Sequence, residues 1–236
     1  MGDIYEKAIN PKQYDLESLS WTKETYESPF RKFYFEYLKK YKNKWKNATI
    51  LEIGCGTGWL LNFLEKEASF VEGIDPSHLN IEFAKKNFPK IKVSHISLEK
   101  FKSSRKYDLI ISVMVLNHIK DIDLAFRKMS RFLKKDGEIQ IIVPDYQYAK
   151  RPRFNYKLVI EKINGHEYAV ETARENGEIT DIIRDNIFYK EAGSKTKLSL
   201  VKFMPLFPTK DLIMVLPKYE KFKDVAISQL LCFRKN

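Results

Sequence analysis

The chain has 236 residues, 44% of them hydrophobic, which suits one α/β domain with a substantial core. Its 42 Lys and Arg residues outnumber 31 Asp and Glu residues, so the formal net charge is +11. The lysines are scattered and often stand beside acids, so a solvated lysine-rich surface is a simpler interpretation than nucleic-acid binding. The longest apolar runs are far shorter than a membrane span, and we expect no membrane insertion.

The two cysteines, Cys55 and Cys232, do not suggest a disulfide framework. No His and Cys spacing suits a zinc site, so we expect no metal. The N-terminus lacks an apolar signal core, and Glu6 stands where a myristoylation signal has Ser or Thr. We therefore expect a cytoplasmic protein in a reducing compartment. The sequence does not distinguish a monomer from a homodimer.

Residues 1–48 are expected to form helices that cap the rest of the domain. Ser28 and Pro29 are typical of a helix start, and aromatic residues follow at helical spacing from Phe30 to Tyr41. The simplest interpretation of this aromatic stripe is a helix packed on a sheet.

An apolar strand pattern at 49–53 passes through three alternate glycines into an apolar helical pattern that begins at Leu60. Glycines let the backbone turn tightly and leave N–H groups bare for a ligand at the helix N-terminus. The dinucleotide fingerprint requires Gly or Ala where this chain has Trp59, a side chain too large for close helix–strand packing. This difference disfavours a dehydrogenase.

The next apolar strand, 70–75, ends at Asp75, 21 positions after Gly54. A doubly wound fold places there the acid that accepts hydrogen bonds from ribose hydroxyls. The alternative role for Asp75 is to cap the helix predicted at 77–87.

Three further strands follow the same alternation with helices. They are expected at 91–93, 107–113 and 139–145, with a helix at 123–133 and a turn at 134–138. The strand at 107–113 is almost wholly apolar, as is typical of a central strand covered on both faces. Five strands alternating with helices predict a parallel doubly wound sheet with ligand sites at the carboxyl ends of its strands.

Beyond Asp145 the pattern changes. Two alternating segments, 168–172 and 179–183, flank the turn pair Asn176-Gly177, which predicts a β-hairpin. A short helix at 185–193 and final strands at 198–203 and 225–233 are expected after it. Residues 146–184 therefore form an insertion that is expected to cover the cleft.

The Gly-x-Gly-x-Gly spacing, with Glu52 two residues before the first glycine, resembles the first motif of class I S-adenosylmethionine-dependent methyltransferases. Val-Leu-x-His-Ile-x-Asp at 115–121 and Leu-Lys-x-x-Gly at 133–137 also resemble that family. The resemblance covers 49–145 well and is loose beyond. It implies an α/β fold: a doubly wound, seven-stranded Rossmann-like sheet whose last two strands are antiparallel, with an N-terminal helical segment and a β-hairpin-containing lid insertion.

The expected organisation is a single methyltransferase domain over 1–236. Its parts are the N-terminal cap helices (1–48), the cofactor-binding core (49–145), the substrate lid insertion (146–184), and the last helix with the C-terminal strands (185–236).

The resemblance implies S-adenosylmethionine as methyl donor and S-adenosylhomocysteine as product. The glycine segment would hold the methionine part, Asp75 the ribose, and the loop at 96–97 the adenine. The family usually has an Asp in that loop, but this chain has Ser97, which leaves the adenine to Ser97, Ile96 or backbone groups. The expected cofactor-binding residues are Glu52, Gly54, Cys55, Gly56, Gly58, Asp75, Pro76, Ile96, Ser97, Val113 and Met114.

Methyl transfer from a sulfonium is an in-line displacement that depends mainly on holding the nucleophile about 3 Å from the methyl carbon. An alcohol acceptor also benefits from a general base. His118, after the fourth strand, is the first candidate, with His166 and Asp145 as rivals. The alternative for His118 is a structural role in the wall of the site.

The expected acceptor is an O or N atom of a small polar metabolite, with an anionic group as one option because the insertion is basic. N-terminal segments of the family often close over the cofactor and help to select the substrate. The candidate substrate-binding residues are Tyr14, Trp21, Tyr26, Arg151, Arg153 and Tyr156.

Two alternatives stay open. The charge of +11 allows an RNA methyltransferase, and the fold allows a non-catalytic S-adenosylmethionine-binding partner protein. Neither Asn/Asp-Pro-Pro-Tyr, typical of enzymes that methylate a flipped base, nor a Pro-Cys pair for attack on cytosine follows the fourth strand. A nucleic-acid substrate is therefore disfavoured.

Overall fold

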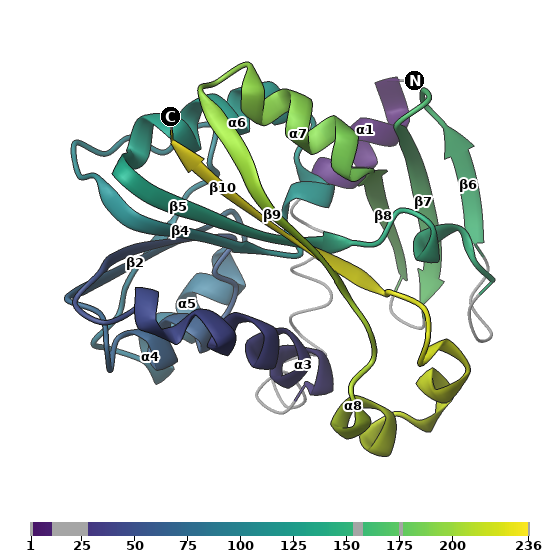
Figure 1. Ribbon diagram of the computed structural model, residues 1–236, viewed down its shortest axis with the longest axis horizontal. Helices are drawn as coiled ribbons and strands as arrows, with labels where there is room; N and C mark the ends of the chain where they lie inside the picture. The colour runs from purple at the N-terminus through teal and green to yellow at the C-terminus, as the bar shows by residue number, and fades with distance from the viewer. Residues whose placement is uncertain (1, 11–27, 153–157, 175–176, 236) are drawn as a thin grey trace.

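A seven-stranded sheet runs through the centre of the molecule in the order β3-β2-β1-β4-β5-β10-β9 (Figure 1). The computed structural model describes residues 2–10, 28–152, 158–174 and 177–235. Its strands are β1 (Thr49–Ile53), β2 (Phe70–Asp75), β3 (Lys92–His95), β4 (Tyr107–Val113), β5 (Leu133–Pro144), β9 (Leu198–Leu206) and β10 (Ser228–Lys235). Neighbours from β3 to β5 are parallel, whereas β10 runs antiparallel to both β5 and β9.

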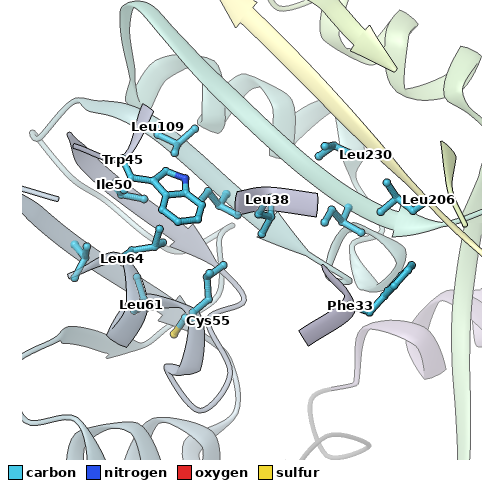
Figure 2. Packing of buried hydrophobic residues seen from close by; sticks show 14 of the residues in the cluster. Phe33, Leu38, Trp45, Ile50, Cys55, Leu61, Leu64, Leu109, Leu206 and Leu230 are labelled. Atoms are coloured by element: carbon cyan, nitrogen blue, oxygen red, sulfur yellow. The ribbon is translucent and has the colours of Figure 1, made fainter. Parts of the chain in front are cut away.

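Helices cover both faces of this sheet. Figure 1 shows α3 (Pro29–Leu38), α4 (Trp59–Leu64) and α5 (His78–Asn87) on one face, and α6 (Ile122–Phe132) and α7 (Asn186–Ser194) on the other. Because successive strand residues point to opposite faces, Ile50 packs with Phe33 and Leu61 in one core, while Leu51 belongs to the core on the other face. Figure 2 shows the first of these cores from close by.

The chain reverses its winding direction between β1 and β4. β1 pairs with β2 on one side and with β4 on the other, so the crossovers leave the centre of the sheet in opposite directions. Such a switch point opens a crevice at the carboxyl ends of the two strands. The glycine segment after β1 and the residues after β4 therefore face the same space.

A second, three-stranded antiparallel sheet forms the insertion, with β6 (Leu158–Lys162), β7 (Glu167–Arg174) and β8 (Gly177–Arg184) in that order. We call it the lid sheet. The helix α1 (Gly2–Ile9) packs on one face of it, where Ala8 contacts Ala169 and Ile182 (Figure 1). The opposite face turns toward the main sheet.

Most of the expected elements are confirmed. Strands 49–53, 70–75 and 107–113 have the expected bounds, and β7 and β8 pair as the expected hairpin strands. The predicted turn at 134–138 is wrong, because β5 already begins at Leu133. The pairing with β4 shifts register there, since Tyr107 pairs with Leu133 and Leu109 with Glu138. Gly137 and its neighbours therefore form an irregularity within β5.

Some elements were not expected from the sequence. They are β6, the helix α8 (Lys210–Val215) and the 3₁₀ helices η2 (Lys39–Lys44), η3 (Leu116–His118), η4 (Tyr148–Lys150) and η5 (Pro217–Phe222). None of the helices in the described part of the chain has the length and apolar character needed to cross a bilayer.

Candidate active site

The chain leaves β1 in a tight bend built by two glycines. Gly54 and Gly56 have φ angles of 71° and 51°, which residues with a side chain rarely adopt. The N–H groups of Gly54 and Cys55 both donate to the carbonyl of Ile74, at 2.8 and 3.0 Å. A Cβ atom on Gly54 would lie 2.2 Å from a methyl carbon of Val115, whereas one on Gly56 would meet nothing within 4 Å. The bend is thus packed behind Gly54 and open beside Gly56.

Gly58 serves a different purpose. It precedes α4, and a Cβ atom there would lie 2.6 Å from Ile91 Cδ1 and 3.2 Å from Ala84 Cβ. The absence of a side chain therefore lets the start of α4 approach α5. Gly58 is not among the residues that line the cavity described below.

Asp75, at the end of β2, holds the bend in place. Its Oδ2 accepts a hydrogen bond from the Gly56 N–H at 2.9 Å, and its Oδ1 accepts one from the Ser77 N–H at 2.8 Å. Ser77 caps α5, because its hydroxyl accepts from the Asn80 N–H. A carboxylate offers about four lone-pair sites, so Asp75 can accept from several donors at once.

Glu52 and Arg31 lie at the same end of the site. Glu52 is buried, and its Oε2 has no hydrogen-bond partner within the described residues. Burial raises the pKa of Glu52 well above its usual value, the nearby Asp75 adds to the rise, and the Arg31 guanidinium opposes it. Arg31, from α3, donates to the Thr57 hydroxyl at 3.0 Å, and burial lowers its pKa to about 10. Sequence reasoning missed Arg31.

These residues line a cavity of about 1430 Å³ at the switch point of the sheet. The cavity runs from the glycine bend past the ends of β1, β2 and β4 to the lid sheet, with α3 as a further wall. Eleven sequence-predicted residues line it: Glu52, Gly54, Cys55, Gly56, Asp75, Pro76, Ile96, Ser97, Val113, Met114 and His118.

The remaining described candidates lie elsewhere. Asp145 accepts hydrogen bonds from the Gln147 and Tyr148 N–H groups at 2.9 and 2.8 Å, just before the 3₁₀ helix η4. His166 is paired with Asp185 at 2.7 Å, which raises the histidine pKa, and it lies outside the cavity lining. Arg151 is exposed and is also outside the lining. Tyr14, Trp21, Tyr26, Arg153 and Tyr156 fall outside the described residues.

At the far end of the cavity, a loop after β4 meets the lid sheet. Asn117 Nδ2 donates to Asp181 Oδ1 at 2.7 Å and lies 2.6 Å from His118 Nε2. His118 Nε2 is also 3.3 Å from Asp181 Oδ1. Three polar side chains from β8 and η3 thus form one cluster at the cavity wall. Sequence reasoning singled out His118 but missed Asn117 and Asp181.

The lid sheet presents a mostly apolar face to the cavity. Ile179, Asp181 and Ile183 alternate along β8, and Val170 and Thr172 alternate along β7 directly beside them. Asp181 pairs with Val170 across the two strands. Among these five side chains, Asp181 is the one with a charge.

A buried ion pair ties the lid sheet to the loop that carries His118. Arg184 is 1% exposed, and its Nε lies 2.7 Å from Glu167 Oε1. The same guanidinium donates to the carbonyls of Leu116 and Lys120, at 3.0 and 3.4 Å. Tyr5 of α1 donates to Glu167 at 3.0 Å. The helix α1, the lid sheet and the loop at 116–120 are therefore joined through one arginine and one glutamate.

The described residues contain no group of three or more His, Cys, Asp or Glu side chains that could hold a metal ion. The lining of the cavity combines hydrogen-bonding and apolar groups. Its two ends differ: backbone N–H groups and two carboxylates surround the glycine bend, whereas side chains of the lid sheet form the other end.

Comparison with known proteins identifies the class. The family model described as a methyltransferase domain matches residues 26–175, more than half of the chain. A ubiquinone biosynthesis O-methyltransferase of Pelagibacter ubique is 40% identical over 96 residues, which cover 39% of this chain and 40% of that protein. One of the same name from Rickettsia canadensis is 25% identical over 179 residues, covering 67% of this chain and 76% of that protein.

The fold likeness extends over almost the whole chain. A crystal structure of an S-adenosylmethionine-dependent methyltransferase from Clostridium acetobutylicum superposes with a TM-score of 0.65. That match covers 94% of this chain and 99% of the other at 14% identity, so it supports the fold alone.

Proposed function

We propose that this chain, which belongs to the family of S-adenosylmethionine-dependent methyltransferases, methylates a hydroxyl oxygen of a small molecule. The observation that carries the proposal is the continuous cavity from the glycine bend to the polar cluster at the lid sheet. One end is suited to a nucleoside and the other to an acceptor. The similar proteins named as ubiquinone biosynthesis O-methyltransferases support oxygen as the acceptor atom.

The residues at the glycine bend fit S-adenosylmethionine. The open space beside Gly56 lets a ligand approach the backbone of the bend closely. Glu52 Oε2, which has no partner in the described part of the chain, and the Arg31 guanidinium provide opposite charges for the amino and carboxylate groups of the methionine part. Asp75 would accept from the ribose hydroxyls, and Ile96 and Ser97 would contact the adenine. When bound, S-adenosylmethionine supplies a methyl group on a positively charged sulfur.

The chain itself contributes position and exclusion of water. Val113 ends β4, Met114 follows it, and both line the cavity. The backbone there is fixed by the hydrogen bond from the Met114 N–H to the Ile142 carbonyl at 2.7 Å. The lid sheet and α3 cover the cavity from two sides. Alignment of the two reacting atoms in a covered site supplies much of the rate enhancement that such a displacement needs.

We also propose that the chain works in a reducing compartment. The thiols of Cys55 and Cys232 are both buried and unpaired, which favours a reducing compartment such as the cytoplasm.

Titration of the purified protein with S-adenosylhomocysteine tests the proposal directly. Calorimetry is expected to show one site per chain, with NAD as a control that does not compete. Methyl-labelled S-adenosylmethionine then reports transfer to a panel of hydroxylated small molecules. A protein that does not bind S-adenosylhomocysteine would contradict the proposed function, whereas one that binds but transfers no methyl group would be a binding partner protein instead.

A further inference from the structure

Among the described lid-sheet residues that line the cavity, Asp181 is the one with a charged side chain. The side chain is 21% exposed and lines the cavity. Its Oδ1 is engaged by Asn117 Nδ2 at 2.7 Å and by His118 Nε2 at 3.3 Å. Its Oδ2 makes no hydrogen bond to the described residues. One oxygen is thus fixed by the wall of the cavity and the other is left for a ligand.

His118 is less well placed to remove a proton. Its Nε2 already lies against Asn117 and Asp181, and its Nδ1 is buried. Neither ring nitrogen therefore faces open space in the cavity. The contacts instead make His118 and Asn117 the groups that orient Asp181.

We propose that Asp181 is the general base for the acceptor hydroxyl and that the acceptor is a phenol, its ring lying on the apolar face of the lid sheet. This inference rests on the proposed function. As the hydroxyl oxygen forms its bond to the methyl carbon, the carbon–sulfur bond breaks and its electron pair stays on sulfur. The hydroxyl proton passes to Oδ2 of Asp181. The products are a neutral ether, a neutral thioether and a protonated carboxyl.

The chemistry of a carboxylate selects the acceptor class. A phenol has a pKa near that of tyrosine, about 10, and is far more acidic than an aliphatic alcohol, so a weak base such as a carboxylate assists it effectively. The neighbours of Asp181 agree with this assignment. Ile179 and Ile183 flank it on β8, and Val170 lies opposite on β7, which gives an apolar surface for a flat ring.

The buried Arg184 holds the strand that carries Asp181 against the loop that carries Asn117 and His118. Arg184, three residues after Asp181 on β8, donates to the carbonyls of Leu116 and Lys120, which flank the loop carrying Asn117 and His118. The strand and the loop are thereby held in one register. This fixed register is what a base needs, because its proton transfer depends on distance and alignment.

The test compares Asp181→Asn with Glu178→Gln, which removes an exposed carboxylate from the same strand. Catechol is the phenolic probe and benzylamine the amine probe, each with S-adenosylmethionine at saturation. We expect wild type and Glu178→Gln to methylate catechol. In Asp181→Asn, kcat is expected to fall by about 100-fold or more while KM changes little, because the amide oxygen still accepts a hydrogen bond. Affinity for S-adenosylhomocysteine and the melting temperature are expected to stay unchanged in all three proteins.

Chemical rescue distinguishes a general base from a residue that has only a structural role. In Asp181→Ala, added sodium formate is expected to restore part of kcat, whereas a merely structural role for Asp181 would give no response to formate. Wild-type kcat in Asp181→Asn, or methylation of benzylamine in place of catechol, would overturn the inference while leaving S-adenosylhomocysteine binding intact. Binding of S-adenosylhomocysteine with no methylation of catechol would overturn the phenol assignment. Failure of the wild type to bind S-adenosylhomocysteine would instead overturn the proposed function.

Discussion

The two ends of the cavity are built in different ways. At the glycine bend, backbone groups and the side chain of Asp75 hold one another over short distances in the parallel sheet. At the lid sheet, contacts between side chains join parts of the chain that are far apart in sequence, such as Asn117 with Asp181 and Arg184 with Leu116. The first end is an integral part of the fold, whereas the second depends on a few long-range polar contacts. The two ends should therefore respond differently to mutation.

The largest effect is expected for Arg184→Ala, which removes the cation that joins the lid sheet to the loop at 116–120. The substitution leaves Glu167 buried without its partner, and breaking a buried pair in this way costs about 3–5 kcal/mol. Urea unfolding is expected to show this loss of stability. Because Arg184 does not touch the glycine bend, the folded fraction at low temperature should keep its affinity for S-adenosylhomocysteine.

The double variant Arg184→Met with Glu167→Gln is the matched control. It removes both charges together, so no buried charge is left unpaired, and stability is expected to recover in part. Equal stability of the single and double variants would show that the ion pair does not join the two parts.

Next in size is Gly54→Ala, which acts at the other end. The added Cβ would lie 2.2 Å from Val115 and the residue would keep a φ of 71°. Overpacking and left-handed backbone strain together cost about 2–5 kcal/mol. The bend is expected to shift, so calorimetry should show a weaker affinity for S-adenosylhomocysteine. Gly165→Ala, where a Cβ would meet nothing within 4 Å, is the control and should change neither quantity.

The difference between the two ends of the cavity also explains which site residues could be predicted from the sequence. Strand bounds at 49–53 and 70–75 followed from apolar runs, and the order of glycines and acids at the strand ends placed most of the cavity-lining residues at the nucleoside end. Local spacing carries this information because the backbone itself makes the contacts. Arg31 was missed because it comes from α3, and no spacing links it to Glu52.

At the acceptor end, local patterns gave the hairpin but not the site. The alternation at 168–172 and 179–183 predicted β7 and β8, whereas β6 is mostly exposed and so has no apolar alternation to reveal it. Asp181 lies between Ile179 and Ile183 on β8, and no local pattern marked it as a site residue. Its role depends on Asn117, 64 positions away, and only the fold brings the two together.

A smaller effect is expected for Asp75→Ala. The substitution removes the acceptor of the Gly56 and Ser77 N–H groups and of the proposed ribose hydroxyls. Leaving such groups unpaired costs about 1–3 kcal/mol, so affinity for S-adenosylhomocysteine should fall by about 5- to 150-fold. Calorimetry measures this loss, and an unchanged affinity would remove Asp75 from the binding site. Catechol methylation at saturating S-adenosylmethionine should be retained, because Asp75 lies away from the lid sheet.

The last effect, which is the sharpest in sign, concerns the pH dependence of Glu52. Because burial raises its pKa in the folded chain, the folded state holds a proton that the unfolded state has released once the pH exceeds 4.5, the ordinary pKa of a glutamate. Stability without ligand is then greatest below that pH and falls as the pH rises toward the pKa of the folded state, by about 1.4 kcal/mol for each pH unit inside this window. Glu52→Gln carries no such proton.

The melting temperature of Glu52→Gln is therefore expected to match that of the wild type near pH 4.5 and to exceed it increasingly as the pH rises. The affinity for S-adenosylhomocysteine is expected to follow the opposite order. The ammonium group of S-adenosylhomocysteine favours an ionised Glu52, so at neutral pH the ligand should bind the wild type more tightly and release a proton on binding. Calorimetry in two buffers of different ionisation enthalpy measures that proton. No proton release from the wild type, or equal release from both proteins, would mean that Glu52 does not face the amino group.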